Sequence, residues 1–440
     1  MKKLLSILLL ATALVACKKD KTPGIAPVDL PVTVSYNLST SAYTLPVNNI
    51  KVKLININTK TVIEASTDAN GKVNFQQISA GTYDIDAVME IDAAQYSQLT
   101  GTPTTQKVTF NASMKGKQID AGFSGELELK LISGTAGNWL IKQVYYGGSD
   151  RTDGALFRDQ FIEIYNNTDA VMYADSLYFS QLWGRQSTTA ARHHFQANGQ
   201  YDWSKSTGMP ANIDANNDYV YTRSIFMIPG TGKQHPVQPG ESIVIAQTAL
   251  NHKSPFTGND GKTVSVNNPA LTVDLSTADF EAYYGDLPGR TPFASDIDNP
   301  NVPNLTVIQF YGNDMVLDNP GRDSYIIFKV DGTSVVSNLP SYSEPLLVPS
   351  STANKYFQLP GKYIIDGIDV QPNTTDSRIP KKLTANIDAG FTLTPKGSFT
   401  SQSVIRKTES TVNGRRILKD TNNSTEDFDV FDIAQPRGFK

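Results

Sequence analysis

Hydrophobic and polar residues alternate over short runs along most of the chain, and turn residues separate these runs. In the run Ile50–Ile55, Val52 and Leu54 fall on one face of an extended strand, because successive side chains of a strand point to opposite faces. The segment Thr67–Gly71 contains an Asn-Gly pair, which accepts the positive φ of a tight turn. The pattern predicts an all-β protein with very little helix.

The first block of predicted strands covers residues 28–133. Its turns and alternating runs predict about seven strands, enough for a small β-sandwich. The block resembles the carboxypeptidase-regulatory or transthyretin-like β-sandwich, whose signature is T-x-x-x-G-x-x-x-F-x-x-I-x-x-G-x-Y. The residues that carry this resemblance are Thr67, Gly71, Phe75, Ile78, Gly81 and Tyr83. The resemblance implies a structural spacer or an interaction module, without catalysis.

A glycine-containing junction at residues 134–138 leads into a second block, residues 139–440. Several of its segments resemble the strands of lamin-tail domains, although they are spread over a longer stretch, so we expect long insertions. We therefore expect two immunoglobulin-like β-sandwiches, of which the second is lamin-tail-like. The segments that carry this resemblance are Gln160–Asn167, Gln238–Ala246, Ser403–Lys407 and Asp420–Phe428.

The second block also resembles the DUF4876 family of Bacteroidetes lipoproteins, over roughly Trp139–Lys440. This resemblance implies a fold and a cell-envelope setting but no assigned activity. The segments that carry it are Phe161–Asn167, Pro229-Gly230, Pro239–Ala246, Asp274–Glu281 and Ile405–Phe428.

One short helix is predicted over Asp274–Gly285. Ser276 is a suitable N-cap, and Asp279 stands three residues later, as in a capping box. Gly285 provides a stop signal. At this length the helix needs tertiary packing to persist.

Residues 1–16 have the features of a bacterial lipoprotein signal peptide. Two lysines precede the apolar stretch Leu4–Leu14, which is too short to span a bilayer that needs about 20 residues. The segment Leu14–Cys17 matches the lipobox, which implies a diacylglycerol group on the Cys17 thiol. Residues 17–27 are then a lipidated tether. Because Lys18 and not Asp follows the cysteine, we expect an anchor in the outer membrane, on a face that the sequence does not assign.

Composition narrows the function classes. The 39 Lys and Arg residues against 43 Asp and Glu give a formal net charge of −4, which argues against a polybasic nucleic-acid binder. A single cysteine excludes an internal disulfide framework and a cysteine-based zinc cluster. No G-x-S-x-G or H-E-x-x-H motif occurs. We expect no enzyme activity and no cofactor, with a hydrolase whose site forms only in the folded chain as an alternative.

Aromatic residues gather in an insertion at residues 178–221, and Tyr and Trp offer large contact area at low entropy cost. The adjacent His193 and His194 suggest metal or haem binding, but neighbouring side chains of a strand point to opposite faces, so no metal site is predicted. The alternative is that the insertion packs over a sheet edge and protects it. The candidate ligand-binding residues are Trp183, His193, His194, Tyr201 and Trp203.

Acidic loops recur at Asp214–Asp218, Asp296–Asn299 and Asp420–Asp427. Oxygen-rich loops can hold Ca²⁺, but none of these follows the EF-hand spacing, and Asp and Asn also favour turns for their own backbone bonds. Calcium and turn formation both stay open at this point.

Taken together, the sequence predicts a lipid-anchored outer-membrane protein that acts as a binding or accessory module. The family setting suggests a TonB-dependent uptake system as its partner. The alternative is a structural or adhesive envelope protein that has no soluble ligand.

Overall fold

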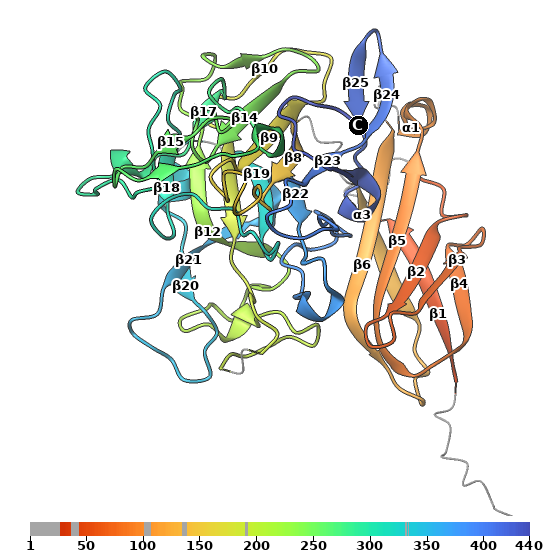
Figure 1. The fold of residues 1–440 in the computed structure, drawn as a ribbon. Coiled ribbons are helices and arrows are strands. Elements are labelled where there is room, and N and C mark those ends of the chain that lie inside the picture. The colour runs from red at the N-terminus through yellow and green to blue at the C-terminus, as the bar shows by residue number, and fades with distance from the viewer. Residues whose placement is uncertain are drawn as a thin grey trace, which may run out of the picture.

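The computed structural model describes residues 27–36, 44–100, 107–133, 139–189, 192–330, 332 and 334–440. The predicted signal peptide, Cys17 and almost all of the predicted tether lie outside these residues. The described chain is mainly β, with several sheets and few helices, as the alternating pattern predicts (Figure 1). No helix in the described part of the chain is long and apolar enough to cross a membrane.

Residues 28–133 form the first β unit, called here the N-terminal unit. Its strands are hydrogen-bonded in the order β3-β2-β5-β6-β7-β1-β4. All neighbours in this order are antiparallel except β1 and β7, which run parallel. The elements are β1 (Val28–Tyr36), β2 (Lys51–Asn56), β3 (Val62–Ser66), β4 (Lys72–Ile78), β5 (Gly81–Ile91), α1 (Ala93–Thr100), β6 (Val108–Ile119) and β7 (Leu127–Ser133).

The alternating sequence of the N-terminal unit becomes alternating burial. In β2, Val52 and Leu54 are buried in one core while Lys51 is exposed, as predicted. The predicted turn at Thr67–Gly71 is also present. Asp68 Oδ1 accepts hydrogen bonds from the backbone N–H groups of residues 70 and 72, which lowers the pKa of Asp68. Gly71 has φ +75°, and a Cβ there would lie 2.5 Å from the carbonyl oxygen of Val34, so only glycine fits.

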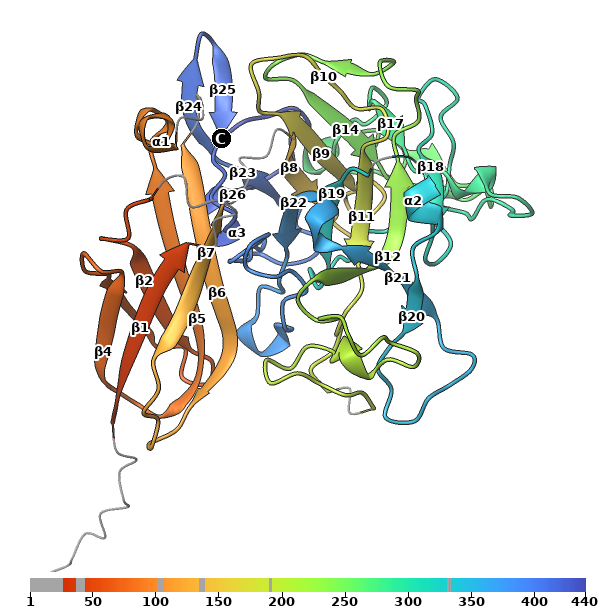
Figure 2. The same ribbon diagram turned by 180° about the vertical axis from the view of Figure 1, so that it is seen from behind.

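Residues 139–440 form the C-terminal unit, which contains two large sheets (Figure 2). The first has the order β20-β21-β12-β11-β19-β22, and β18 pairs with β12 beside this path. We call it the β12 sheet. Its strands are β11 (Tyr178–Leu182), β12 (Tyr219–Met227), β18 (Thr306–Gln309), β19 (Ser324–Phe328), β20 (Ser341–Ser343), β21 (Lys355–Pro360) and β22 (Ile364–Asp369).

The second sheet, called the β8 sheet, has the order β17-β14-β9-β8-β23-β26. Its strands are β8 (Trp139–Tyr145), β9 (Phe161–Asn166), β14 (Ser242–Ala246), β17 (Phe280–Glu281), β23 (Ser403–Arg406) and β26 (Phe428–Phe431). The predicted strand segments at Gln160–Asn167 and Gln238–Ala246 thus contain β9 and β14.

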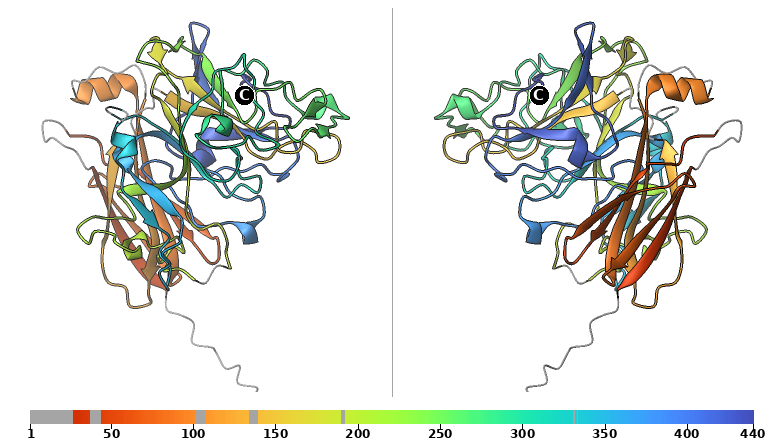
Figure 3. Two further views of the ribbon diagram at one scale, coloured as in Figure 1. Left: turned by 90° about the vertical axis from the view of Figure 1, so that its left-hand side faces the viewer. Right: turned by 90° about the vertical axis from the view of Figure 1, so that its right-hand side faces the viewer.

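Smaller elements connect and cover the two sheets. The β15–β16 hairpin projects from the rest of the C-terminal unit (Figure 3). The remaining strands are β10 (Met172–Tyr173), β13 (Pro236–Val237), β15 (Phe256–Thr257), β16 (Thr263–Val264), β24 (Thr408–Val412) and β25 (Arg415–Leu418). The helices are α2 (Ser334–Ser337), α3 (Ser424–Asp427) and the 3-10 helices at Trp203–Lys205, Pro269–Leu271, Tyr284–Asp286, Gly361–Tyr363 and Thr375–Ser377.

The main core of the C-terminal unit lies between its two sheets, and neighbouring residues of a strand divide between this core and an outer cluster. Phe179 belongs to the main core, whereas Tyr178 joins a second cluster on the other face of the β12 sheet. In the β8 sheet, Ile162 faces the main core and Phe161 joins a third cluster, which includes Val273 from a long connection. Both sheets are therefore covered on both faces.

The predicted helix at Asp274–Gly285 is wrong. Phe280 and Glu281 form β17, which pairs in parallel with β14, and a 3-10 turn follows at Tyr284–Asp286. The predicted capping residue Ser276 instead bonds back to Asp274, through both its N–H and its hydroxyl group. The buried Glu281 accepts the N–H of Ala249. Pairing at the sheet edge therefore outweighs the local helix signals, which stabilise a short helix only weakly.

The two units touch along β6 (Figures 1 and 2). Near its start, Lys107 forms an ion pair with Glu409 of β24, at 3.1 Å. Asn111 Nδ2 donates to the carbonyl oxygen of Thr421, at 3.0 Å. Near its end, a Cβ on Gly116 would lie 3.1 Å from the backbone nitrogen of Asn198. The N-terminal unit therefore contacts the aromatic insertion of the C-terminal unit directly.

Candidate functional site

The aromatic insertion packs against the β12 sheet and forms what we call the aromatic cluster. Trp203 stacks on Tyr221 of β12, with ring centroids 3.6 Å apart. Trp183, which follows β11, stacks on Tyr356 of β21 at 4.9 Å. The buried members are Tyr201, Trp203, Ala215, Tyr221 and Tyr356, and Trp183, Phe195, Met209, Ile213 and Tyr342 pack against them.

Short-range polar bonds hold Trp203 in the aromatic cluster. Asp202 caps the 3-10 turn that begins at Trp203 by accepting from Ser204 N–H. Asn216 Oδ1 accepts from Trp203 N–H at 2.8 Å. The Asn and Asp residues of this insertion are turn formers that fix the direction of the aromatic side chains.

Glu344 links two of the predicted site residues. One of its carboxylate oxygens accepts from the indole N–H of Trp183, and the other contacts His193 Nε2, each at 2.7 Å. A carboxylate only accepts hydrogen bonds, so His193 carries a proton on Nε2. Burial, together with the nearby Glu344 charge, raises the pKa of Tyr201 and of Tyr356, and both phenols stay neutral. Glu344 thus directs its charge toward donors of the cluster.

Backbone pairing brings the insertion beside the segment that follows β20. His193 and Leu346 form an antiparallel bridge. His194 N–H donates to Pro345 O at 2.8 Å, and Leu347 N–H donates to Arg192 O at 2.9 Å. Because side chains alternate along paired segments, His193 enters the aromatic cluster while Arg192 stays exposed. Residues 192–194 of the insertion are therefore paired with residues 345–347, directly after β20.

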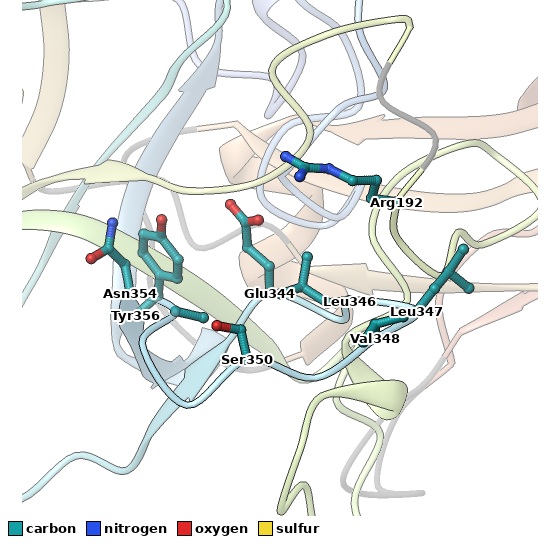
Figure 4. A pocket seen from close by; sticks show the side chains of 9 residues that line it. Arg192, Glu344, Leu346, Leu347, Val348, Ser350, Asn354 and Tyr356 are labelled. Carbon is teal, nitrogen blue, oxygen red and sulfur yellow. The ribbon is translucent and has the colours of Figure 1, made fainter.

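A groove of about 520 Å³ opens beside this pairing (Figure 4). Arg192 lies above one wall, and its guanidinium extends over the groove toward the side where Glu344 lies. Tyr356 and Asn354 lie at the other end. The residues that line the groove are Arg192, Glu344, Leu346, Leu347, Val348, Ser350, Ala353, Asn354 and Tyr356.

The rim of the groove combines the Arg192 guanidinium with exposed aliphatic groups. Leu347 is 53% exposed and Val348 is 81% exposed, so two neighbouring apolar residues are open to solvent beside the groove. Within the described part of the chain, Arg192 makes no side-chain hydrogen bond, ion pair or ring contact. Arg185, by comparison, bonds three backbone carbonyls and stacks on Phe195. Arg192 is thus free to bind a group from outside the chain.

The structure divides the five predicted site residues. Trp183 and His193 stand behind the groove and contact its wall through Glu344. Tyr201 and Trp203 are each 4% exposed, so they support the groove from within. His194 is partly exposed, and within the described residues only its backbone forms hydrogen bonds, donating to Pro345 O and accepting from Asp202 N–H. Ligand binding by these residues stays a prediction.

Sequence reasoning missed most of the groove. Arg192 stands next to the predicted His193, so the local sequence did mark its position. Glu344, Leu347, Val348 and Tyr356 lie about 150 residues further along the chain, and no local motif identifies them. Only the long-range pairing brings them to the insertion.

Two other histidines are placed by packing. Burial lowers the pKa of His252 to about 3, so its ring is neutral, and it lies edge-on to Phe256. His235 lies edge-on to Phe280. Among the described residues, no three His, Cys, Asp or Glu side chains are grouped as metal ligands.

The acidic loops make bonds within the fold. Asp214 accepts backbone N–H groups of its own turn, and Asp296 accepts Tyr284 N–H. Burial raises the pKa of Asp296 to about 6. Asp427 accepts Thr421 N–H and lies 3.5 Å from Arg406. In these contacts the carboxylates stabilise turns and buried parts of the fold. Calcium binding by the loops stays a prediction.

Comparison with known families matches the second half of the chain. Residues 238–434 match the model of the DUF4876 family, described as protein of unknown function. A DUF4876 family protein from Bacteroides thetaiotaomicron has a similar fold, with a TM-score of 0.51 and 22% identity, over 92% of this chain and 95% of that chain. The DUF4876 resemblance, predicted over roughly Trp139–Lys440, is therefore confirmed for residues 238–434, and the structural likeness shows the fold alone.

Other solved structures match this chain with much lower TM-scores. Fervidolysin from Fervidobacterium pennivorans, a keratinolytic enzyme related to subtilisin, matches with a TM-score of 0.18 and 14% identity, over 50% of this chain and 31% of that chain. The minor pilin GBS52 from Streptococcus agalactiae matches with a TM-score of 0.14 and 13% identity, over 54% of this chain and 89% of that chain. No curated protein matches the sequence significantly.

Proposed function

Taking as premise that residues 238–434 form a DUF4876 region in a mainly β chain, we propose that this protein is a non-enzymatic binding module. Its ligand enters the groove between Arg192 and the segment Glu344–Tyr356. The observation that carries the proposal is the rim, where the Arg192 guanidinium, which has no partner within the described residues, adjoins exposed Leu347 and Val348. A concave site whose lining combines apolar side chains with polar groups that can orient a ligand is typical of small-molecule binding.

The rest of the chain serves this module. In the proposal, acyl chains on Cys17 hold the protein in the outer membrane, and the N-terminal unit is a transthyretin-like spacer. The C-terminal unit is a lamin-tail-like sandwich that presents the groove to an outer-membrane uptake transporter. Contacts along β6 support a fixed spacing between the two units, because they lie at both ends of the strand.

A structural or adhesive role without a soluble ligand is the second candidate. The burial of Tyr201 and Trp203 favours it, since these side chains cover the edge region of the β12 sheet. The groove favours the binding role, because exposed Leu347 and Val348 contribute nothing to such a cover.

A thermal-shift screen with a small-molecule library tests the binding role. Val348→Asp places a charge in the groove, and Val412→Asp makes the same change at a 49% exposed position on the β24–β25 hairpin. Compounds that raise the melting temperature of the wild type and of Val412→Asp, but not of Val348→Asp, support the groove. If every stabilising compound acts equally on all three proteins, the proposed site is wrong.

Fractionation of cells tests the anchor. We expect wild-type protein in the membrane fraction after a carbonate wash, and Cys17→Ala in the soluble fraction, because the acyl chains supply the membrane affinity. Retention of Cys17→Ala in the washed membranes would contradict the anchor.

A further inference from the structure

The groove carries features that narrow the chemistry of its ligand, and this step rests on the binding role proposed above. Arg192 supplies a guanidinium that has no partner within the described residues. The guanidinium is planar and carries five N–H donors, which match the two oxygens of a carboxylate. The ligand is therefore expected to bring an anionic head group to this end of the groove.

The carboxylate of Glu344 is engaged within the protein, in contrast to the Arg192 guanidinium. Both of its oxygens already accept N–H groups from the protein, one from Trp183 and one from His193, and its side chain is 22% exposed. No ion pair joins it to Arg192 within the described residues. Glu344 keeps its negative charge, but its oxygens are engaged on the protein side, so the guanidinium is the charged group whose donors are open to a ligand among the described residues.

The wall next to Arg192 is apolar. Leu346, Leu347 and Val348 follow one another along the segment whose backbone is bonded to Arg192 itself, so the charge and the apolar groups are held in one piece of structure. Val348 is 81% exposed and Leu347 is 53% exposed. A ligand that covers these groups gains hydrophobic stabilisation in proportion to the apolar area that it buries.

We infer that the groove binds an organic carboxylate that has an apolar body. The carboxylate pairs with Arg192, and the body lies on the Leu346–Val348 wall. The volume of about 520 Å³ is in the range of sites for small organic molecules. A medium-chain fatty acid and the C-terminus of a short hydrophobic peptide share this chemistry.

Isothermal titration calorimetry on the full-length protein tests the inference with four probes. Octanoate carries both features, octanamide keeps the body without the charge, and acetate keeps the charge without the body. The dipeptide Leu-Leu carries a free carboxylate on a different apolar body. We expect binding of octanoate or of Leu-Leu, at least tenfold weaker binding of octanamide, and no detectable binding of acetate. The tighter of the two carboxylates identifies the source of the ligand.

Matched variants test whether Arg192 binds the carboxylate of the probe. Arg192→Gln should weaken the binding of the carboxylate probe at least tenfold, and Arg192→Lys should weaken it less, because it keeps the charge without the planar fork. Arg416→Gln removes an exposed arginine from the β24–β25 hairpin and should change nothing. Circular dichroism confirms that each variant is folded.

The outcomes distinguish failure of the proposed ligand class from failure of the groove as a binding site. If octanoate and octanamide bind equally, or if Arg192→Gln binds as well as wild type, the carboxylate class is wrong. If neither carboxylate binds, the class is also wrong, even where the compound screen finds ligands that depend on Val348. If no compound in that screen depends on Val348, the groove itself fails as a binding site.

Discussion

The strands of the two units differ in how they are buried. In the N-terminal unit, burial alternates along β1 and β2, so one face of each strand points into the core and the other points outward. In the C-terminal unit, every residue of β8, β9, β11 and β19 is buried. The sheets of the C-terminal unit therefore have a cover on their outer faces, which the N-terminal unit does not share.

The cover comes from the long connections of the C-terminal unit. Leu275 and Val302 cover the β8 sheet, and Leu383 and Ile387 cover the β12 sheet. The aromatic insertion is a third part of this cover. The groove lies where that part meets the segment after β20, so the same insertions that stabilise the unit also build its candidate site. This difference agrees with the proposed roles, in which the N-terminal unit is a spacer and the C-terminal unit carries the binding groove.

Truncation of Trp203 should give the largest loss if the aromatic insertion is a true part of the core. Trp203 is 4% exposed and stacks on Tyr221, so Trp203→Ala should lower the free energy of unfolding by about 3–5 kcal/mol. Urea unfolding followed by circular dichroism measures this loss. A cost below about 1 kcal/mol would show that the insertion is only loosely attached.

The outer cover of the β12 sheet should also behave as core. Ile326 is fully buried in the outer cluster, and Ile326→Ala should cost about 2–5 kcal/mol. Lys51→Ala, at an exposed position of β2 in the N-terminal unit, is the matched surface change and should stay within about 0.5 kcal/mol. Equal effects in urea unfolding would remove the distinction between covered and open faces.

Burial of carboxylates in the C-terminal unit should appear as a pH dependence. Burial raises the pKa of Asp159 to about 7, although Tyr145 donates a hydrogen bond to it. The folded state therefore holds the proton more tightly than the unfolded state, and stability falls as the pH rises from about 4 to about 7, by about 1.4 kcal/mol for each unit of pKa difference. Asp159→Asn should lack this part of the decline.

Urea unfolding of wild type and Asp159→Asn over this pH range measures the difference. The three tryptophans, at positions 139, 183 and 203, all belong to the C-terminal unit, so their fluorescence follows that unit. Parallel pH profiles of the two proteins would contradict the assigned pKa.

Val348→Asp should have the smallest effect on stability. The residue is 81% exposed, so the change should alter the free energy of unfolding by no more than about 0.5 kcal/mol. Val412→Asp provides the control at another exposed position. A large loss for Val348→Asp alone would show that Val348 packs against the protein, and that the groove is closed in solution.

The sequence predicts local structure well where one short-range rule decides. The structure confirms the alternation at Val52 and Leu54 and the Asn-Gly turn that ends in Gly71. Both features depend only on residues a few positions apart, through the two-residue repeat of a strand and the conformational preferences of turn residues. The helix signals at Ser276 and Gly285 are equally local, yet they fail. There the pairing of Phe280 with Ile245 decides, and no local pattern contains that information.

The candidate site shows the same limit. Aromatic composition drew attention to Trp183 and His193, which do reach the wall of the groove. It could not separate them from Trp203, whose burial depends on Tyr221 of the β12 sheet. Nor could it find Val348, since an exposed valine has no signature in the sequence until the chain folds.

Methyl-resolved NMR of the full-length protein during a titration with octanoate tests the central claim most directly. We predict that the shifted methyl signals belong to Leu346, Leu347 and Val348, while those of the exposed Val62 and Val412 stay unchanged. Unchanged signals at the groove, or shifts spread equally over all five residues, would contradict the assignment of a binding site to this groove.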